Sequence, residues 1–596
     1  MAHFNAATLL ADVIRDPAAF QIIANHIPEL TANPILHTLY HYELGLILGT
    51  EESLRDNPAK RDEILAMIEA LQPSPSVDRT IARKPLAAIE DSGSPVLAGR
   101  HPEYAAEGRK WEKYEVRLHG PSHGNPFTDV ELSAEFTSDN QTLTVSGFYD
   151  GDSTYRIRLL VPAEGEWTFT TRSNAKSLDA ISGSFTAAAP LPESRGLVRV
   201  ADTFHFAYDD GTPYLPVGTT SYAWTHQGSE LEEQTLLTLA SGPFNKVRMC
   251  VFPKSYMFNE NEPEIYPYEG SFQDGFDYFR PNPLFYHRLE GRIEQLEELG
   301  VEADLILFHA YDRWGFSRMN ATADDLYVKY ITARLASHRN IWWSLANEFD
   351  LLFEKTVEDW ERFAVLVQEN DPNNHLISIH NCREMYDHSR PWITHCSIQR
   401  IDAYLTAEMT TTWRQEWHKP VVIDECAYEG NIDQGWGNIT GEEMTRRCWE
   451  GAVRGGYVGH GETYIAPNDI LWWAKGGRLH GTSPDRIGFL KRVMEESPKK
   501  HLEPLKGYGD APSAGIKDQY ELIYLGFNQP RYRRFVKPSG VQFEIDIVDT
   551  WNMTIETLPE TYEGRFSIDL PGRQYMAIRL RAITEEPASG NVDPQA

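Results

Sequence analysis

The sequence predicts a multidomain α/β protein: a (β/α)8 TIM barrel flanked by two β-sandwich domains, with a small helical domain at the N-terminus. Three observations support this fold class. The chain has 596 residues, about four times the roughly 150 residues of a typical domain. Between residues 196 and 500, apolar strand-like runs alternate with helical stretches. On either side of that region, apolar and polar residues alternate with a period of two, as in half-buried strands.

Residues 1–72 are predicted to form the small helical domain, because residues such as Leu10, Val13 and Ile14 share one helical face. A proline-rich linker, residues 73–102, follows. A domain of this size has little core of its own, so its apolar faces should dock on the rest of the chain or on a second subunit. Since symmetric oligomers are common, we predict a homo-oligomer that forms through this domain.

Two regions are predicted to be β-sandwiches. Residues 103–195 contain short alternating segments such as Tyr114–Leu118, separated by Gly, Asp and Asn turns, which is typical of an Ig-like sandwich. Residues 505–583 return to the same pattern, for example in Val541–Val548, and predict a second small sandwich. The last residues, 584–596, form a polar tail.

Residues 196–500 are predicted to be the barrel, because eight strand–helix units fit into about 300 residues. The segment 252–282, rich in Tyr, Phe, Pro and Gly, should form a long loop after the second strand, at the face where barrel enzymes hold their active sites. The predicted strands are Leu215–Thr219, Lys246–Val251, Ala303–His309, Ile341–Asn347, Leu376–His380, His395–Ile398, Val421–Glu425 and Tyr457–Tyr464. The predicted helices are Leu231–Ala240, Pro283–Leu299, Asp324–His338, Lys355–Asn370, Glu442–Arg454 and Ser483–Glu496.

Composition and motifs argue against several classes of protein. The net charge of −31 argues against a nucleic-acid partner, which needs a basic footprint. No window approaches the roughly 18 apolar residues of a membrane span. No His-Glu-x-x-His motif, EF-hand loop or Cys-x-x-Cys pair occurs, so we expect neither a metal nor a cofactor. The N-terminus lacks a basic region followed by a long apolar run, which indicates a cytoplasmic enzyme or one whose export signal was removed.

Two carboxylates stand at the ends of predicted barrel strands. Asn347 and Glu348 end the fourth strand, and Glu425 ends the seventh. Catalytic residues of this fold lie at the C-terminal ends of strands. One such Glu is explained as well by a helix cap or an ion pair. Two facing each other across the barrel mouth are what glycoside cleavage requires, because one protonates the leaving oxygen while the other attacks or stabilises the anomeric carbon.

These strand ends resemble the signature of the clan A retaining glycoside hydrolases. The segment Arg339–Asp350 is particularly similar to bacterial barrel enzymes of the apiosidase-like and family 5-like type, and so is Pro213–Trp224. The resemblance covers residues 105–583 in domain order, and its specific motifs lie within 213–480. The N-terminal helical domain lies outside it.

The resemblance implies a role for each matching residue. Glu348 would be the acid/base and Glu425 the nucleophile, while Asn347 would bond the sugar 2-hydroxyl. Arg248, at the end of the second strand, matches the arginine beside the nucleophile, which it would keep ionised. The family's strand-six tyrosine is not evident here. Either His395 or Gln399 would take its place in positioning the nucleophile.

Further substrate-binding candidates lie near the predicted rim of the barrel. Of the adjacent Trp472 and Trp473, one would form the aromatic platform under the sugar and the other would be core; the sequence leaves open which. Glu429, four residues after the predicted nucleophile, is expected to be peripheral. The other candidates are the histidines and the loop aromatics His309, His380, His395, His460, Tyr222, Trp224 and Tyr256.

The resulting hypothesis is a retaining glycoside hydrolase that acts on β-linked oligosaccharides or small glycosides from the chain end, with carbohydrate as its partner. An endo-acting polysaccharide hydrolase or a transglycosylase would use the same residues. An inactive carbohydrate-binding protein is the alternative from another class, and the presence of both carboxylates argues against it.

Overall fold

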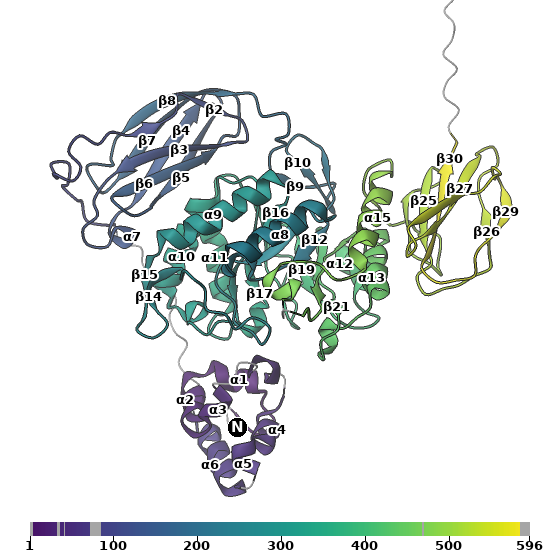
Figure 1. The fold of residues 1–596 in the computed structure, drawn as a ribbon, viewed down its shortest axis with the longest axis horizontal. Coiled ribbons are helices and arrows are strands. Elements are labelled where there is room, and N and C mark those ends of the chain that lie inside the picture. The colour runs from purple at the N-terminus through teal and green to yellow at the C-terminus, as the bar shows by residue number, and fades with distance from the viewer. Residues whose placement is uncertain are drawn as a thin grey trace, which may run out of the picture.

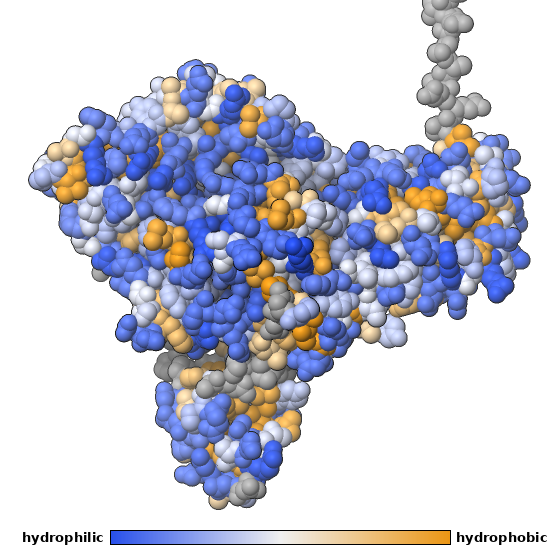
Figure 2. All heavy atoms as spheres, viewed as in Figure 1, coloured by the Kyte–Doolittle hydropathy of each residue, from blue (hydrophilic) through white to orange (hydrophobic). Residues whose placement is uncertain are grey.

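A computed structural model describes residues 4–31, 36–40, 42–55, 57–71, 85–467 and 470–583. Figure 1 shows a central barrel, a curled sheet against one side of it, a sandwich at the C-terminal end and a separate helical lobe formed by the N-terminal residues. The face visible in Figure 2 is mostly hydrophilic, and its hydrophobic residues are scattered. No helix in the described ranges has the length and apolar character needed to cross a membrane.

The N-terminal lobe is helical, as the apolar periodicity predicts. Its hydrophobic core includes Leu10, Ile23 and Ile64, which are all fully buried. Proline at the first helical position and Asp16, whose side chain accepts the N–H groups of Ala18 and Ala19, begin the second helix. The helices are α1 (Leu10–Arg15), α2 (Pro17–His26), α3 (Pro28–Thr31), α4 (Leu44–Thr50), α5 (Glu52–Arg55) and α6 (Pro58–Glu69).

Part of the predicted linker, residues 73–102, belongs to the β-domain that follows it. Residues 72–84 lie outside the described residues, but Ile89 pairs with Ala175 and the Asp91 carboxylate accepts two hydrogen bonds from Ser177. The second half of the segment therefore packs on the sheet that follows, because its polar groups find partners there.

The first β-domain has two layers joined by one long strand. The first half of β5 pairs with β4 and its second half pairs with β6, so the strand passes from one layer to the other. Both layers bury a common core that includes Val116, Phe136 and Trp167. A short helix, α7 (Pro126–Asp129), precedes β4. The strands are β1 (Glu103–Tyr104), β2 (Glu107–Arg109), β3 (Lys113–His119), β4 (Leu132–Ser138), β5 (Gln141–Tyr149), β6 (Thr154–Leu160), β7 (Gly165–Ser173) and β8 (Ser182–Ala188).

The barrel has eight parallel strands. Five form one sheet and three form another. Bridges between His380 and Ser397 and between Thr219 and His460 close the two sheets into a ring. The strands are β12 (Gly218–Thr220), β13 (Lys246–Cys250), β16 (Glu302–His309), β17 (Ile341–Asn347), β18 (Leu376–Ser378), β19 (Cys396–Gln399), β20 (Val421–Glu425) and β22 (Tyr457–Val458). A three-stranded sheet leads into them: β9 (Val198–Ala201), β10 (His205–Tyr208) and β11 (Pro213–Tyr214).

Helices surround the barrel strands, including one that the sequence analysis missed. Helix α12 begins with three threonines, whose low helix propensity hides it from pattern reading. The predicted loop 252–282 also contains a hairpin of β14 (Tyr268–Ser271) and β15 (Gly275–Pro281). The helices are α8 (Ser229–Ser241), α9 (Pro283–Glu298), α10 (Ala321–Leu335), α11 (Val357–Asn370), α12 (Thr410–Trp417), α13 (Gly441–Val453), α14 (Trp472–Lys475) and α15 (Ser483–Glu495). A two-stranded sheet joins β21 (Glu429–Gly430) to β23 (Glu462–Thr463).

The C-terminal domain is a sandwich of a five-stranded and a two-stranded sheet. Side chains of both sheets, such as Phe535 and Ile578, meet in one core. The predicted tail, residues 584–596, lies outside the described residues. The strands are β24 (Ser513–Ile516), β25 (Tyr520–Tyr524), β26 (Tyr532–Val536), β27 (Phe543–Asp549), β28 (Thr554–Thr557), β29 (Arg565–Asp569) and β30 (Met576–Ala582).

Candidate active site

Glu348 directly follows β17 and has a left-handed backbone conformation, with φ of 54°. For a residue other than glycine this conformation is strained, and such strain persists only where the surroundings hold it. Phe349 donates its N–H to the carbonyl of His380 at 2.9 Å. The Asp350 carboxylate accepts the N–H groups of Cys382 at 2.6 Å and of two further residues. The turn that projects Glu348 is therefore tied to the loop after β18.

The Glu348 carboxyl lies in an environment that favours its protonated form. Burial, together with the nearby Glu425 charge, raises its pKa to about 7. The Tyr311 hydroxyl, which donates to Glu348 Oε2, opposes this shift. The Asn347 side-chain amide also lies 3.3 Å from the same oxygen. A carboxyl with this pKa can give up and take back a proton near neutral pH.

The Glu425 carboxyl lies at the end of β20 among groups that favour its ionised form. Burial raises its pKa, but His380, Arg248 and the Tyr222 hydroxyl outweigh burial and hold the pKa at about 2. Tyr222 donates to Glu425 Oε1, and His380 Nε2 lies 3.2 Å from the same oxygen. The other ring nitrogen of His380 contacts Ser397 Oγ at 2.9 Å, which fixes the orientation of the imidazole. This carboxylate is suited to act as a nucleophile.

Arg248, on β13, acts on the site through Asn347. Its guanidinium donates to Asn347 Oδ1 at 2.8 Å and to Ser344 Oγ at 3.2 Å. The Tyr222 hydroxyl oxygen also lies 3.2 Å from Asn347 Oδ1, but its single proton is donated to Glu425. With its oxygen held by the Arg248 guanidinium, the Asn347 amide presents its N–H group toward Glu348.

Gln399 connects the two carboxylates. A register shift in the pairing of β19 with β20 lies just before it, and such a bulge re-aims a side chain. With its nitrogen directed at the carboxylates, the Gln399 amide lies 3.2 Å from Glu425 Oε2 and 3.1 Å from Glu348 Oε1. Because one nitrogen atom reaches both, these two oxygens are no more than about 6.3 Å apart. Of the two candidates on strand six, Gln399 thus contacts the carboxylates.

The structure also separates the two adjacent tryptophans. Trp473 belongs to a cluster at the barrel mouth with Tyr222 and Tyr256, and its ring centroid lies 5.6 Å from that of Tyr222. Trp472 instead packs in the main core, where its indole N–H donates to Thr219 Oγ1 at 2.8 Å. Trp473 is therefore the residue placed to form an aromatic platform.

Four predicted site residues make other contacts. His309, at the end of β16, bonds the Phe252 carbonyl at 3.2 Å, and burial lowers its pKa to about 3. His395 directly precedes β19, at the opposite end of that strand from Gln399. The His395 ring lies edge-on to the Trp342 ring. The His460 ring is within hydrogen-bond distance of Thr219 Oγ1, at 2.9 Å. The Trp224 indole N–H donates to Met249 Sδ at 3.4 Å.

Glu429 caps a helix. Its carboxylate accepts hydrogen bonds from the backbone N–H groups of Thr482 and Ser483 at 2.7 and 3.0 Å, where α15 begins. The residues beside the site that the sequence reasoning missed are Lys254, which lies in the long loop after β13 with its ammonium over the Tyr222 and Tyr311 rings, and Tyr311 as the partner of Glu348. Both belong to aromatic-rich loops after strand ends, which is the one signal that points to them.

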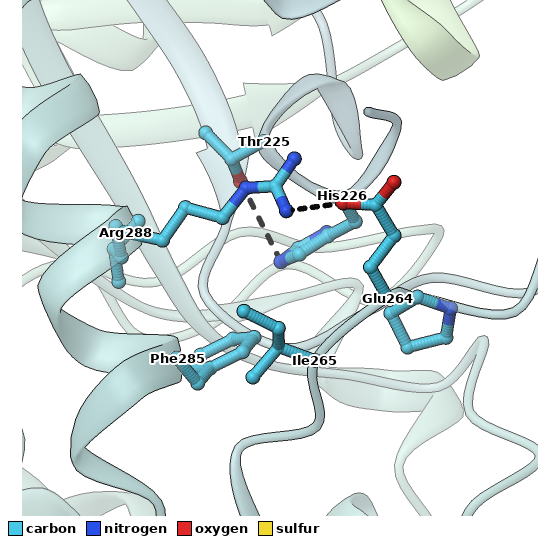
Figure 3. Close-up of a pocket in the computed structure, with 8 residues that line it drawn as sticks. Thr225, His226, Glu264, Ile265, Phe285 and Arg288 are labelled. Carbon is cyan, nitrogen blue, oxygen red and sulfur yellow. Dashed lines mark hydrogen bonds and ion pairs between the residues drawn. The ribbon is translucent and has the colours of Figure 1, made fainter. Parts of the chain in front are cut away.

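Two cavities lie away from the carboxylate pair, and neither is lined by Glu348 or Glu425. Figure 3 shows the first, where Arg288 lies beside Glu264 at 2.7 Å and Phe285 forms part of the wall. Its volume of about 10 Å³ holds about one water molecule. The second, of about 390 Å³, lies where residues near the end of α13 meet the C-terminal domain, and includes Arg454 and Tyr508.

One group of residues in the described ranges has a spacing compatible with a metal ion. It comprises His205, His501 and Glu503. Two of its three members already have protein partners, because His205 Nε2 contacts Glu503 Oε1 at 2.5 Å and Arg414 donates to the other Glu503 oxygen at 2.8 Å. The Arg414 cation disfavours a second positive charge there. His205 also contacts Tyr457 at the start of β22, at the end of the barrel away from the carboxylates.

Family models match three parts of the chain. The model of the apiosidase-like catalytic domain matches residues 201–498. Two models described as domains of unknown function, DUF5060 and DUF5605, match residues 107–174 and 509–581. Among curated proteins, none matches the chain.

Solved structures share the fold. A protein from Bacteroides vulgatus ATCC 8482, named as a candidate glycoside hydrolase, is 38% identical, with a TM-score of 0.77; the match covers 80% of this chain and 100% of that one. A glycoside hydrolase family 5 protein from the same organism is 16% identical, with a TM-score of 0.51, and the match covers 66% and 94%. A further glycoside hydrolase is 15% identical, with a TM-score of 0.53 and coverage of 66% and 99%. The last two show the fold alone.

Proposed function

The chain belongs to the apiosidase-like glycoside hydrolases, and we propose that it cleaves β-glycosidic bonds with retention of anomeric configuration. The observation that carries this proposal is the contact of the Gln399 amide nitrogen with both carboxylates, which places Glu425 Oε2 and Glu348 Oε1 at most about 6.3 Å apart. Retaining enzymes hold their carboxyl groups about 5–5.5 Å apart, whereas inverting enzymes leave about 6.5–9.5 Å for a water molecule.

In the first step, Glu348 donates its proton to the leaving glycosidic oxygen while Glu425 attacks the anomeric carbon. The C–O bond to the leaving group breaks as an ester bond to Glu425 Oε forms. In the second step, Glu348, now ionised, removes a proton from water, whose oxygen attacks the anomeric carbon and releases Glu425. The opposite pKa directions of the two carboxyls support this division of roles, since the acid begins protonated and the nucleophile begins ionised.

Neighbouring residues bind and orient the sugar. Asn347, whose oxygen is held by Arg248, presents its N–H group to the 2-hydroxyl. Trp473 offers a ring face for the sugar C–H groups. Gln399 keeps the two carboxylates at a fixed separation. A contact to the 2-hydroxyl that strengthens in the transition state lowers the barrier selectively.

We further propose that the enzyme acts from the chain end on oligosaccharides or small glycosides. The side chains of Glu348 and Glu425 belong to residues only 5% and 6% exposed, which suits an enclosed pocket better than an open cleft. The N-terminal lobe lies near the loop that follows β17, where Tyr40 packs edge-on against Phe353 with ring centroids 4.3 Å apart. This lobe limits the space beyond the sugar that is cleaved.

The anomeric form of the first product tests the mechanism. Proton NMR recorded in the first minutes of hydrolysis of a β-aryl glycoside should show the β-anomer, which then mutarotates. Initial release of the α-anomer would contradict retention. Single sugars released successively from an oligosaccharide support exo action, whereas internal fragments contradict it. New, longer products with an added acceptor sugar would identify a transglycosylase.

The state of the cysteines supports a reducing, cytoplasmic location, which we propose. All five cysteines are free, and four of them are buried. A chain folded in an oxidising compartment more often uses such residues as disulfides.

A further inference from the structure

Lys254 lies at the centre of the aromatic cluster above the two glutamates. It follows β13 in the loop that leads to Tyr256 and is almost fully buried. Its ammonium nitrogen lies 3.5 Å from the ring centroid of Tyr222, 4.2 Å from that of Tyr311 and 4.6 Å from that of Trp473. Such contacts attract a cation through the negative faces of the rings.

The ammonium makes no hydrogen bond to any of the residues that the structure describes. Its backbone is fixed, because Asn259 donates its side-chain N–H to the Lys254 carbonyl at 2.7 Å. An ammonium group has three N–H donors, and ring faces do not replace the acceptors that water would provide. Buried charges in proteins are normally paired and hydrogen-bonded. Lys254 thus holds donors that a ligand can use.

The two tyrosines under the ammonium place it between the catalytic carboxyls. Tyr222 donates its hydroxyl to Glu425, and Tyr311 donates its hydroxyl to Glu348. A cation over both rings therefore faces the space that the sugar must occupy while both carboxyls react. Trp473, the third ring, is the residue placed to form the sugar platform.

The surrounding charges favour a neutral sugar as the partner of Lys254. Below the site, the Lys246 ammonium contacts Asp304 at 2.5 Å and Asp424 at 2.8 Å, and Arg248 lies 3.8 Å from Asp304. These two cations and two carboxylates balance. Lys254 then balances the ionised Glu425, so a uronate would add an uncompensated negative charge beside the nucleophile.

We propose that the Lys254 ammonium is a substrate-binding group that donates a hydrogen bond to one hydroxyl of the neutral sugar held between Glu348 and Glu425. This inference rests on the proposed function. The aromatic cage keeps the cation in place before the sugar binds, so little side-chain entropy is lost when the hydrogen bond forms. Lys254 is thereby a determinant of which sugar is cleaved, because a sugar without that hydroxyl leaves the ammonium without an acceptor.

The test combines a lysine variant with deoxy substrates. Lys254→Met keeps the length and apolar stem within the cage, and Lys499→Met, at an exposed lysine, is the matched control. The neutral aryl glycoside that the wild type cleaves best is compared with its monodeoxy analogues and with the corresponding aryl uronide. With wild-type enzyme, one deoxy position should lower kcat/KM by about 10- to 100-fold, as expected for a hydrogen bond to a charged donor.

Lys254→Met should lower kcat/KM on the parent glycoside by a similar factor and show no further loss on that one deoxy analogue, because hydroxyl and ammonium act as a pair. The inference is overturned if a folded Lys254→Met variant cleaves the parent glycoside with the kcat/KM of the wild type. It is also overturned if the variant lowers kcat/KM by the same factor on the parent glycoside and on every monodeoxy analogue. Preference of the wild type for the uronide also overturns it. If Lys254→Met does not fold, Lys254→Arg is used instead. Because arginine keeps the cation, this variant must still show a lower kcat/KM on that one monodeoxy analogue than on the parent glycoside.

The two proposals fail in different ways. A wild-type chain that cleaves no glycoside contradicts the proposed function and the Lys254 inference with it. The Lys254 inference alone is contradicted if the wild type is active and Glu425→Ala is inactive, while Lys254→Met cleaves the glycoside like the wild type.

Discussion

The surroundings of Glu425 and Glu348 differ although both residues are buried glutamates at the ends of barrel strands. Glu425 faces His380, Arg248 and the Tyr222 hydroxyl, which hold its pKa at about 2 despite burial. Glu348 has fewer compensating groups, so burial and the charge of Glu425 raise its pKa to about 7. The same residue type therefore obtains two chemical roles from its neighbours.

The difference follows from which strands supply the neighbours. Tyr222 and His380, which contact Glu425, lie two residues after the ends of β12 and β18, and Arg248 lies within β13. Tyr311, the hydroxyl donor to Glu348, likewise lies two residues after the end of β16. Glu425 thus differs from Glu348 in having a histidine and a strand guanidinium among the groups that lower its pKa.

The largest effect is expected from removing the nucleophile. Glu425→Ala should lower kcat by at least about 10⁴-fold at every pH, because no other group can form the covalent intermediate. Steady-state assays across pH 4–9 measure this. Glu429→Gln is the matched control: it removes another buried carboxylate, so Tm should fall while kcat stays within a few-fold. Equal loss of activity in both variants would contradict the role of Glu425.

A smaller and leaving-group-dependent effect is expected from removing the acid/base. Glu348→Ala should lose about 10²- to 10⁴-fold on glycosides with poor leaving groups, which need a proton, and far less on a dinitrophenyl glycoside. Azide should restore turnover and give a glycosyl azide, because it attacks the intermediate without base assistance. A loss that is independent of the leaving group and not rescued by azide would show that the two roles are not divided as proposed.

A few-fold effect is expected on the Glu348 side of the mouth, where the helical lobe contacts the barrel. Tyr40→Ala removes the contact with Phe353, in the loop after β17, and should raise activity on long oligosaccharides relative to an aryl monosaccharide. Tyr532→Ala, at a residue 54% exposed in the C-terminal domain, is the control. Ratios of kcat/KM for the two substrates give the answer. If Tyr40→Ala and Tyr532→Ala give the same ratio, the lobe does not limit substrate length.

The helical lobe also retains exposed apolar residues, including Leu9, Tyr42 and Leu46. We expect these to join two subunits, so deletion of residues 1–84 should reduce the mass measured by light scattering by more than the deleted residues. The cut precedes Ile89, which packs on the first sheet. A mass that falls only by the deleted segment means that the lobe serves its own chain.

The barrel and the two glutamates were predictable because the sequence patterns that indicate them lie within short segments of the chain. Strands β17 and β20 begin and end where the sequence analysis places them, since an apolar run ends abruptly at a polar residue in each. The family assignment was also predictable, because the motifs at these two strand ends carry it.

Other parts of the site depend on contacts that periodicity does not encode. His380 and His395 both flank predicted strands, but only His380 lies at the end of its strand that faces the mouth. Trp472 and Trp473 are adjacent, yet one enters the core and the other the mouth. Lys254 lies in a loop without a repeating pattern, so only the folded chain shows the rings around its ammonium.

The pH dependence of kcat/KM for two leaving groups tests the central claim most directly. Glu348 must be protonated to assist departure, so a glycoside with a poor leaving group should be cleaved progressively more slowly above about pH 7, the pKa of Glu348. A dinitrophenyl glycoside of the same sugar needs no proton and should not show this decline. An equal decline for both substrates, or none between pH 6 and 9 for the first, would contradict the assignment of Glu348 and Glu425 to separate roles.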